Sequence, residues 1–155
     1  MTIIDLAVEA ANARKFRQRL DLDQLDYRRE LVRLIELGAS QNQLSRVLRI
    51  TQPSLSSAMK TAVKVTRPRE GFSGADPYEL CQRFAVGELT REQVTEELSR
   101  WDYVAAQPVE NQDYFDDLRF SKPGSFDDVV RAFDDGLIDG TIYDAVLAHV
   151  AAGKS

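Results

Sequence analysis

The sequence predicts an all-α protein with a basic N-terminal domain and a small acidic C-terminal domain of two helical hairpins. Three observations favour this fold class. Apolar residues recur at helical spacing, and capping residues precede the periodic segments. The charge also changes sign along the chain: residues 1–70 carry 13 Lys/Arg and 8 Asp/Glu, whereas residues 71–155 carry 7 and 17. We therefore expect domains at 1–65 and 77–155, joined by a Pro- and Gly-rich linker at 66–76.

Composition excludes several classes of protein. The 155 residues are 43% hydrophobic and 29% charged, as in a folded protein of one or two small domains. No apolar run reaches 18 residues and no leader is recognisable, so a cytoplasmic protein without a membrane contact is expected. Cys81 and His149 are the only residues of their kinds, which argues for a buried structural thiol and against a zinc site. No catalytic grouping or phosphate loop is present, so we expect neither an enzyme nor a cofactor.

Two helices are predicted before residue 38. The first covers Thr2 to about Leu20, with Ile4, Val8 and Ala11 on one face and a basic cluster at residues 14–19. It is either a packing helix with a solvated basic end or a helix that forms a dimer or touches phosphates. The second covers about Gln24 to Leu37 and ends at Gly38; its apolar face consists of Tyr27, Leu31, Leu34 and Ile35.

A pair of short helices follows. Ser40 to Gln43 has the form of a capping box, so a third helix begins near Gln41, with an apolar stripe of Leu44, Val47 and Leu48. Thr51 caps the next helix, and Pro53 suits its first turn because the amide hydrogen there has no partner within the helix. The buried stripe of this fourth helix is predicted to be Leu55, Ala58, Met59, Ala62 and Val63.

The opposite face of the fourth helix is small, polar or basic. A step of about 100° per residue turns these side chains outward: Pro53, Ser54, Ser57, Lys60, Thr61 and Lys64. A helix that reads bases needs small or hydrogen-bonding groups on its outer face. No acidic residue occurs in the 29 residues from Gln41 to Arg69, as a surface that faces phosphates requires. This pattern favours DNA binding; the alternative is an ordinary helical hairpin in a protein interface.

The stretch QNQLSRVLRITQPSLSSAMK resembles the helix-turn-helix of bacterial transcriptional regulators. It matches the usual pattern at Gln41, Leu44, Leu48, Ile50, Thr51, Gln52, Leu55 and Ser56, and ITQPSLS is similar to the start of the recognition helix in LysR-type regulators. The resemblance covers residues of about 28–64 and none of the acidic half. It departs from the pattern at Ser45, where Ala is usual, and at Arg49, where Gly is usual. The resemblance implies that residues 1–65 form a helix-turn-helix DNA-binding domain.

The resemblance also implies roles for individual residues. Gln52, Pro53, Ser54 and Ser57 would face base edges, while Ser40, Gln41, Lys60 and Lys64 would approach phosphates; Thr51 and Thr61 complete the candidate surface. Gln52 is the best specificity candidate, because glutamine pairs bidentately with adenine. For Ser54, a role as a helix-capping residue without any contact to DNA is an equally good interpretation. Arg67 and Arg69 could enter a minor groove or contact phosphates, or could simply belong to a linker.

The acidic half repeats one pattern at an offset of 49 residues. Residues 77–98 and 126–147 each contain a helix, a glycine stop, an apolar residue, an N-cap and a second helix. The glycines are Gly87 and Gly136, and the caps are Thr90 and Asp139. Duplication and shared hairpin construction explain this equally well. The intervening segment is expected to pack as an irregular strap through Trp101 and Tyr103, with a short extended piece at Tyr114 to Phe120.

These features predict a sequence-specific repressor that binds double-stranded operator DNA as a homodimer. The whole chain resembles helix-turn-helix antitoxins that repress their own operon and sequester a toxin, and also phage or plasmid repressors. In an antitoxin the acidic half would bind a toxin or another basic protein. The alternative is a protein-interaction adaptor, in which the acidic half binds a partner protein and the helix-turn-helix is only a scaffold.

Overall fold

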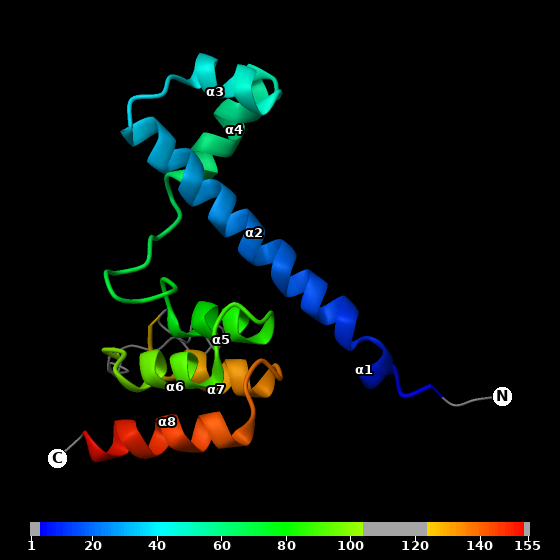
Figure 1. Cartoon of the computed structure of the whole chain (residues 1–155), viewed down its shortest axis with the longest axis vertical. Helices are drawn as coiled ribbons and strands as arrows, with labels where there is room; N and C mark the ends of the chain where they lie inside the picture. The colour runs from blue at the N-terminus through cyan, green and yellow to red at the C-terminus, as the bar shows by residue number, and fades with distance from the viewer. Residues whose placement is uncertain (1–3, 104–123, 154–155) are drawn as a thin grey trace, which may run out of the picture. The chain divides into compact units, whose positions relative to one another are not determined.

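The computed structural model describes residues 4–103 and 124–153, which form eight helices and no strand (Figure 1). The prediction of an all-α protein is therefore confirmed. The chain divides into two compact units, Met1–Arg67 (unit 1) and Pro68–Ser155 (unit 2). None of the described helices combines the length and the apolar character that crossing a membrane requires.

Unit 1 contains α1 (Leu6–Glu9), α2 (Ala11–Glu36), α3 (Gln41–Leu48) and α4 (Gln52–Ala62). Its core lies where α4 packs on the C-terminal part of α2 and α3 packs on α4, through the buried side chains of Leu31, Leu44, Leu55 and Met59. Figure 1 shows α3 and α4 at this end of α2, and the N-terminal half of α2 extending away from them. The core thus fixes α4 against α2 and leaves the N-terminal half of α2 outside the cluster.

The two predicted helices at residues 2–20 and 24–37 are wrong in their boundaries. The chain forms a short α1, turns at Ala10, and then continues as one unbroken helix from Ala11 to Glu36. The predicted break near residue 21 rested on a change in apolar pattern, but no proline or glycine lies there to stop a helix. Ile4 and Val8 are 66% and 67% exposed, so the expected apolar face of the first helix has no partner within the described residues.

Three residues of the predicted buried stripes also differ. Val47 in α3 is 78% exposed and Val63 is 66% exposed, whereas Leu44, Leu55 and the other predicted positions of these stripes are buried or half-buried. Val63 lies beyond the last helical residue of α4, and α3 presents only a narrow strip to its neighbours. Tyr27 is 41% exposed, because the packed cluster begins about one turn further along α2, at Leu31.

Unit 2 contains α5 (Pro77–Ala85), α6 (Arg91–Ser99), α7 (Asp127–Asp134) and α8 (Gly140–Ala152). Sequence neighbours pack as pairs, α5 with α6 and α7 with α8, and the pairs meet through α5 on α7 and α6 on α8. Their core is a cluster of apolar side chains that includes Leu80, Val94, Leu98, Val129, Ile142 and Val146. The two segments with similar sequence thus build one common core.

The turns of the two hairpins have the same backbone hydrogen bonds. Gly87 donates its N–H to the carbonyl of Phe84 and Gly136 to that of Phe133, both at 3.0 Å. Both glycines have positive φ, 88° and 77°. The next residue in each turn closes a longer bond, from Glu88 to Arg83 at 2.8 Å and from Leu137 to Ala132 at 2.9 Å. Both turns are therefore Schellman turns, in which glycine relieves left-handed strain.

Most of the predicted linker belongs to unit 2. The backbone N–H and hydroxyl of Ser73 donate to the Glu97 carboxylate at 2.6 and 2.8 Å, and the N–H of Ala75 donates to Glu79 at 3.1 Å. The unit boundary lies between Arg67 and Pro68, and the residues after it are held by carboxylates rather than extended as a free connection.

The start of the predicted strap packs on the unit 2 core. Trp101 is buried against Phe72 with ring centroids 4.6 Å apart, and the hydroxyl of Tyr103 donates to the carbonyl of Leu98 at 2.5 Å. The extended piece expected at residues 114–120 lies outside the described residues. Cys81 is buried in the same core, and burial raises the pKa of its thiol to about 12, as expected for an unreactive structural thiol.

Candidate nucleic-acid interface

The N-terminus of α3 is fixed by a capping box. The N–H of Gln43 donates to the Ser40 hydroxyl at 3.1 Å, and the N–H of Ser40 donates to the Gln43 side-chain carbonyl at 2.8 Å. Two amide groups that a helix end leaves unpaired are thereby satisfied. The predicted start of this helix and its reciprocal cap are confirmed. Ser40 and Gln41 are both exposed at this end.

The turn after α3 is tight and depends on a residue in an unusual conformation. Arg49 has φ 58° and ψ 42°, the left-handed region, and is the only described non-glycine residue with positive φ. The N–H of Ile50 donates to the carbonyl of Ser45 at 3.1 Å, and the Ser45 hydroxyl donates to the carbonyl of Ile50 at 2.7 Å. These two bonds tie α3 to the start of α4. Ser45 therefore closes the turn as well as allowing a close approach of the helices.

The start of α4 is capped by Thr51. Its hydroxyl oxygen accepts the N–H of Ser54 at 3.2 Å and lies 2.9 Å from the Ser54 hydroxyl, and Pro53 stands in the first turn. Thr51 rather than Ser54 is thus the N-cap. The Ser54 side chain is exposed on the first turn of α4. Ser54 is therefore not the N-cap; its backbone N–H donates the hydrogen bond that the capping residue Thr51 accepts.

All ten candidate DNA-binding residues are exposed. Nine lie where the sequence predicts them: Ser40 and Gln41 at the start of α3, and Thr51, Gln52, Pro53, Ser54, Ser57, Lys60 and Thr61 from the cap to the last turn of α4. Lys64 lies in the turn beyond Ala62 instead of on the helix. Leu55 and Met59 occupy the other face of α4 and are buried. The helix therefore has one apolar side and one free side.

A side-chain contact joins the two helix starts. The amide nitrogen of Gln52, the first residue of α4, donates to the amide oxygen of Asn42 in the first turn of α3. The N-terminal ends of both helices, each carrying a partial positive charge, therefore lie close together. The sequence-based candidate set omits Asn42. Asn42 lies ten residues before Gln52 in the sequence, and three residues separate the two helices. Its contact with Gln52 can be predicted only when the starts of both helices are known.

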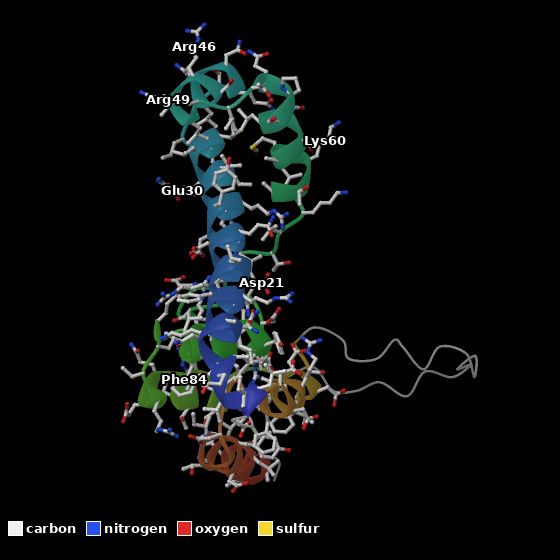
Figure 2. The ribbon with its side chains drawn as sticks, turned by 90° about the vertical axis from the view of Figure 1, so that its right-hand side faces the viewer. Asp21, Glu30, Arg46, Arg49, Lys60 and Phe84 are labelled. Atoms are coloured by element: carbon white, nitrogen blue, oxygen red, sulfur yellow. The ribbon has the colours of Figure 1, made fainter. Side chains whose placement is uncertain are left out.

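The surroundings of α3 and α4 are positive. Arg46, Arg49, Lys60 and Lys64 lie on this pair or its turns, and the acid-free stretch contains no carboxylate to neutralise them. In Figure 2 Lys60 points away from α4 on the side opposite to Arg46 and Arg49, so cations border the helix pair on two sides. Arg46 and Arg49 are exposed and are absent from the predicted set. A surface with this charge attracts a polyanion through long-range electrostatics, and this attraction does not require a binding pocket.

Arg67 and Arg69 are engaged within the protein. A nitrogen of Arg67 lies 3.0 Å from a Glu36 carboxylate oxygen, and the Arg69 guanidinium lies over the rings of Phe72 and Trp101 at 5.5 and 5.1 Å. A flexible basic arm needs its cations free to enter a groove. The two arginines therefore have partners within the protein, and their contact with a minor groove or with phosphates stays a prediction.

The arrangement can position a helix against a polyanion. The exposed side chains on α4 are hydroxyls, an amide, a proline and a lysine, which can donate and accept hydrogen bonds and neutralise charge. No protein-family model, curated protein or solved structure matches this chain.

Proposed function

We propose that the protein is a sequence-specific DNA-binding repressor in which α3 and α4 form a helix-turn-helix and α4 enters the major groove. The observation that carries this proposal is the free face of α4, which is exposed from Gln52 to Thr61, small or polar, and set in a stretch without acids. A major groove about 12 Å wide admits an α-helix, and short side chains on the facing side let the helix backbone come close to the base edges. The residues Pro53, Ser54 and Ser57 have such short side chains.

The contacts at the helix starts support assigned roles. Ser40 and Gln41 are exposed at the start of α3, where the helix dipole favours phosphate oxygens. Lys60 and Lys64 supply charge near the other end of α4. Gln52 reads a base edge, and Asn42 holds its amide through the hydrogen bond between them. Phosphate contacts would position the helix, and Gln52 with the hydroxyls of α4 would supply discrimination.

The test of this function is DNA affinity measured across salt concentrations, with the protein's own upstream DNA and an unrelated duplex as probes. We expect tighter binding to the upstream DNA and a linear fall of log K with log salt. Lys60→Ala is expected to reduce the slope by about one unit. Arg33→Ala is the matched control, because it removes the same charge from α2, where Arg33 pairs with Glu30, instead of from α4. Equal affinity for both duplexes, or no binding, would contradict the proposal.

Sequence readout has a separate test. Gln52→Ala is expected to cost about 1–3 kcal/mol on the preferred site and much less on unrelated DNA. Asn42→Ala is expected to relax the same base position while leaving phosphate contacts and their salt dependence unchanged, since it acts only through Gln52. Competition binding to sites randomised one base pair at a time measures both effects. A uniform loss over all sequences would assign Gln52 to a phosphate instead.

For unit 2 we propose a protein-binding role, as in an antitoxin that covers a basic toxin. The support is charge: residues 71–155 carry 17 acids and 7 bases, in a unit with its own core. Co-expression with the product of the neighbouring reading frame tests this version. A neighbour that is toxic alone and harmless with this chain supports it, and a neighbour harmless by itself ends it. If the protein binds no DNA but binds this neighbour, the adaptor function replaces repression.

A further inference from the structure

Residues 13–27 of α2 have an apolar face that the part of the chain described by the structure leaves largely exposed. Phe16, Leu20 and Tyr27 are 57%, 69% and 41% exposed, and Ala13 is exposed on the same face. Their spacings of three, four and seven residues place them on one side of the helix. A seam of this kind on a long helix is typical of a surface that pairs with another helix.

The charges beside this seam distinguish its possible partners. The six residues before Leu20 contain four cations and no acid, and the six after it contain three acids and no cation. A second copy laid parallel would set cations beside cations and acids beside acids. A second copy laid antiparallel, centred on Leu20, sets the basic half of each helix beside the acidic half of the other, which is favourable.

Side-chain size agrees with the antiparallel arrangement. Leu20 would meet Leu20 of the second copy at the two-fold axis. Ala13 would lie opposite Tyr27, so the smallest residue of the seam faces the largest. Phe16 would lie opposite Gln24, whose stem can cover the ring while its amide remains in water. The seam is thus self-complementary in both charge and volume, as a two-fold interface must be.

We propose that two copies of this chain associate through antiparallel pairing of residues 13–27 of α2. The paired segment is short, so the interface lies at the low end of known sizes, below about 1,200 Å² in total. We therefore expect a dissociation constant on the order of micromolar and a dimer that is weakened when salt screens its charges.

The pairing gives a spacing that suits DNA. Leu31, which contributes to the cluster with Leu55 and Met59 of α4, stands eleven residues after Leu20. At 1.5 Å per residue, the two copies of Leu31 would be about 33 Å apart along the helix axis. Half-sites on one face of DNA are about 34–36 Å apart. This inference deepens the proposed function, and the spacing argument rests on it; the pairing itself does not.

The first test is the mass of the full chain by sedimentation equilibrium over a wide range of protein concentration, without DNA. We expect reversible dimerisation, and Leu20→Asp should weaken it at least about tenfold because two carboxylates would meet at the axis. Val47→Asp is the matched control: Val47 is 78% exposed, lies on α3, and receives the same charge change. A wild-type chain that stays monomeric, or a Leu20→Asp variant that still dimerises, would overturn the proposal. Circular dichroism verifies that both variants fold.

The second test concerns orientation. Ala13→Cys and Tyr27→Cys variants should form an intermolecular disulfide when mixed, and neither should cross-link with itself. The native Cys81 is buried and can remain in place. Self-cross-linking of either variant, or no cross-link in the mixture, would overturn the antiparallel arrangement. Because neither test contains DNA, a protein that dimerises in this way but binds no DNA would refute the proposed function alone.

Discussion

The two units use charged side chains in opposite ways. In unit 2 the carboxylates of Glu79, Glu97 and Asp128 and the guanidinium of Arg83 are buried, and each has a hydrogen-bond partner. In the described part of unit 1 no charged side chain is buried, and the cations around α3 and α4 stand at the surface. Charge therefore maintains the fold in unit 2, while in unit 1 it remains accessible to a partner. Net charge alone does not reveal this difference.

The sharpest way to break the comparison is to remove a buried cation from unit 2. Arg83 lies 2.9 Å from Glu79 and 2.6 Å from Glu88, and its side chain and that of Glu79 are 8% and 4% exposed. Arg83→Ala leaves the Glu79 carboxylate buried without its cation, so we expect unit 2 to lose about 3–5 kcal/mol. Urea unfolding followed by Trp101 fluorescence measures this. A loss as small as that of a surface pair would show that the network is not structural.

The reverse experiment adds an acid to the free face of α4. Ser57→Glu is expected to lower DNA affinity at least about tenfold, or about 1.4 kcal/mol, because a carboxylate would face phosphates. The stability of unit 1 should change by no more than about 0.5 kcal/mol, since Ser57 is exposed. Ala145→Glu, at an exposed position of α8, is the control for added charge. Equal losses of affinity in both variants would make the effect non-specific.

A smaller effect is expected at the turn between α3 and α4. Arg49 adopts φ 58°, so Arg49→Gly should stabilise unit 1 by about 1 kcal/mol through relief of left-handed strain. Gly38→Ala is the matched opposite change: its φ is 104° and nothing lies within 4 Å of the added Cβ, so only the backbone conformation resists it. Thermal unfolding of both variants should show shifts of opposite sign. Shifts of the same sign would remove strain as the explanation.

The smallest effect concerns an exposed ion pair that joins the hairpins. The Arg91 guanidinium contacts both oxygens of Asp139 at 3.1 and 2.7 Å, and this hydrogen bonding lowers the pKa of Asp139 from 3.8 to about 2. Because the folded-state pKa is lowered, the stabilisation is complete above pH 3.8 and is lost as the pH falls towards 2. Asp139→Asn should flatten the decline of unit 2 stability over this range. An unchanged pH profile would assign the decline to other carboxylates.

Much of the local structure follows from residue types alone. The starts of α3, α4 and α6 are predictable because Ser40, Thr51 and Thr90 each have a hydroxyl three residues before an amide in need of a partner. Glycine stops are equally predictable at Gly87 and Gly136, where the backbone must turn left-handed. The exposed set on α4 follows from the burial of Leu55 and Met59 one face away.

The remainder depends on contacts between distant residues. Helical periodicity predicts that Val47 is buried, but it cannot show whether a neighbouring element covers this side chain, and Val47 is exposed. The hydrogen bond between Gln52 and Asn42 can be predicted only when the geometry of the turn between α3 and α4 is known. The contacts of Arg69 with Phe72 and Trp101 likewise depend on the fold of unit 2. The break predicted inside α2 is wrong for the converse reason, since a change of pattern without a helix-breaking residue does not interrupt a backbone.

The matched turns at Gly87 and Gly136 have a consequence for protein engineering. Each turn depends on a glycine with positive φ and on backbone hydrogen bonds between residues the same number of positions apart. We therefore expect that the loop of one hairpin can replace that of the other and keep its backbone conformation. The ion pair of Arg83 with Glu88 has no counterpart in the second hairpin, where Ala132 and Leu137 stand at the equivalent positions, and it would not survive such an exchange. The two hairpins of unit 2 therefore share the backbone structure of their turns and differ in the contacts that their side chains make.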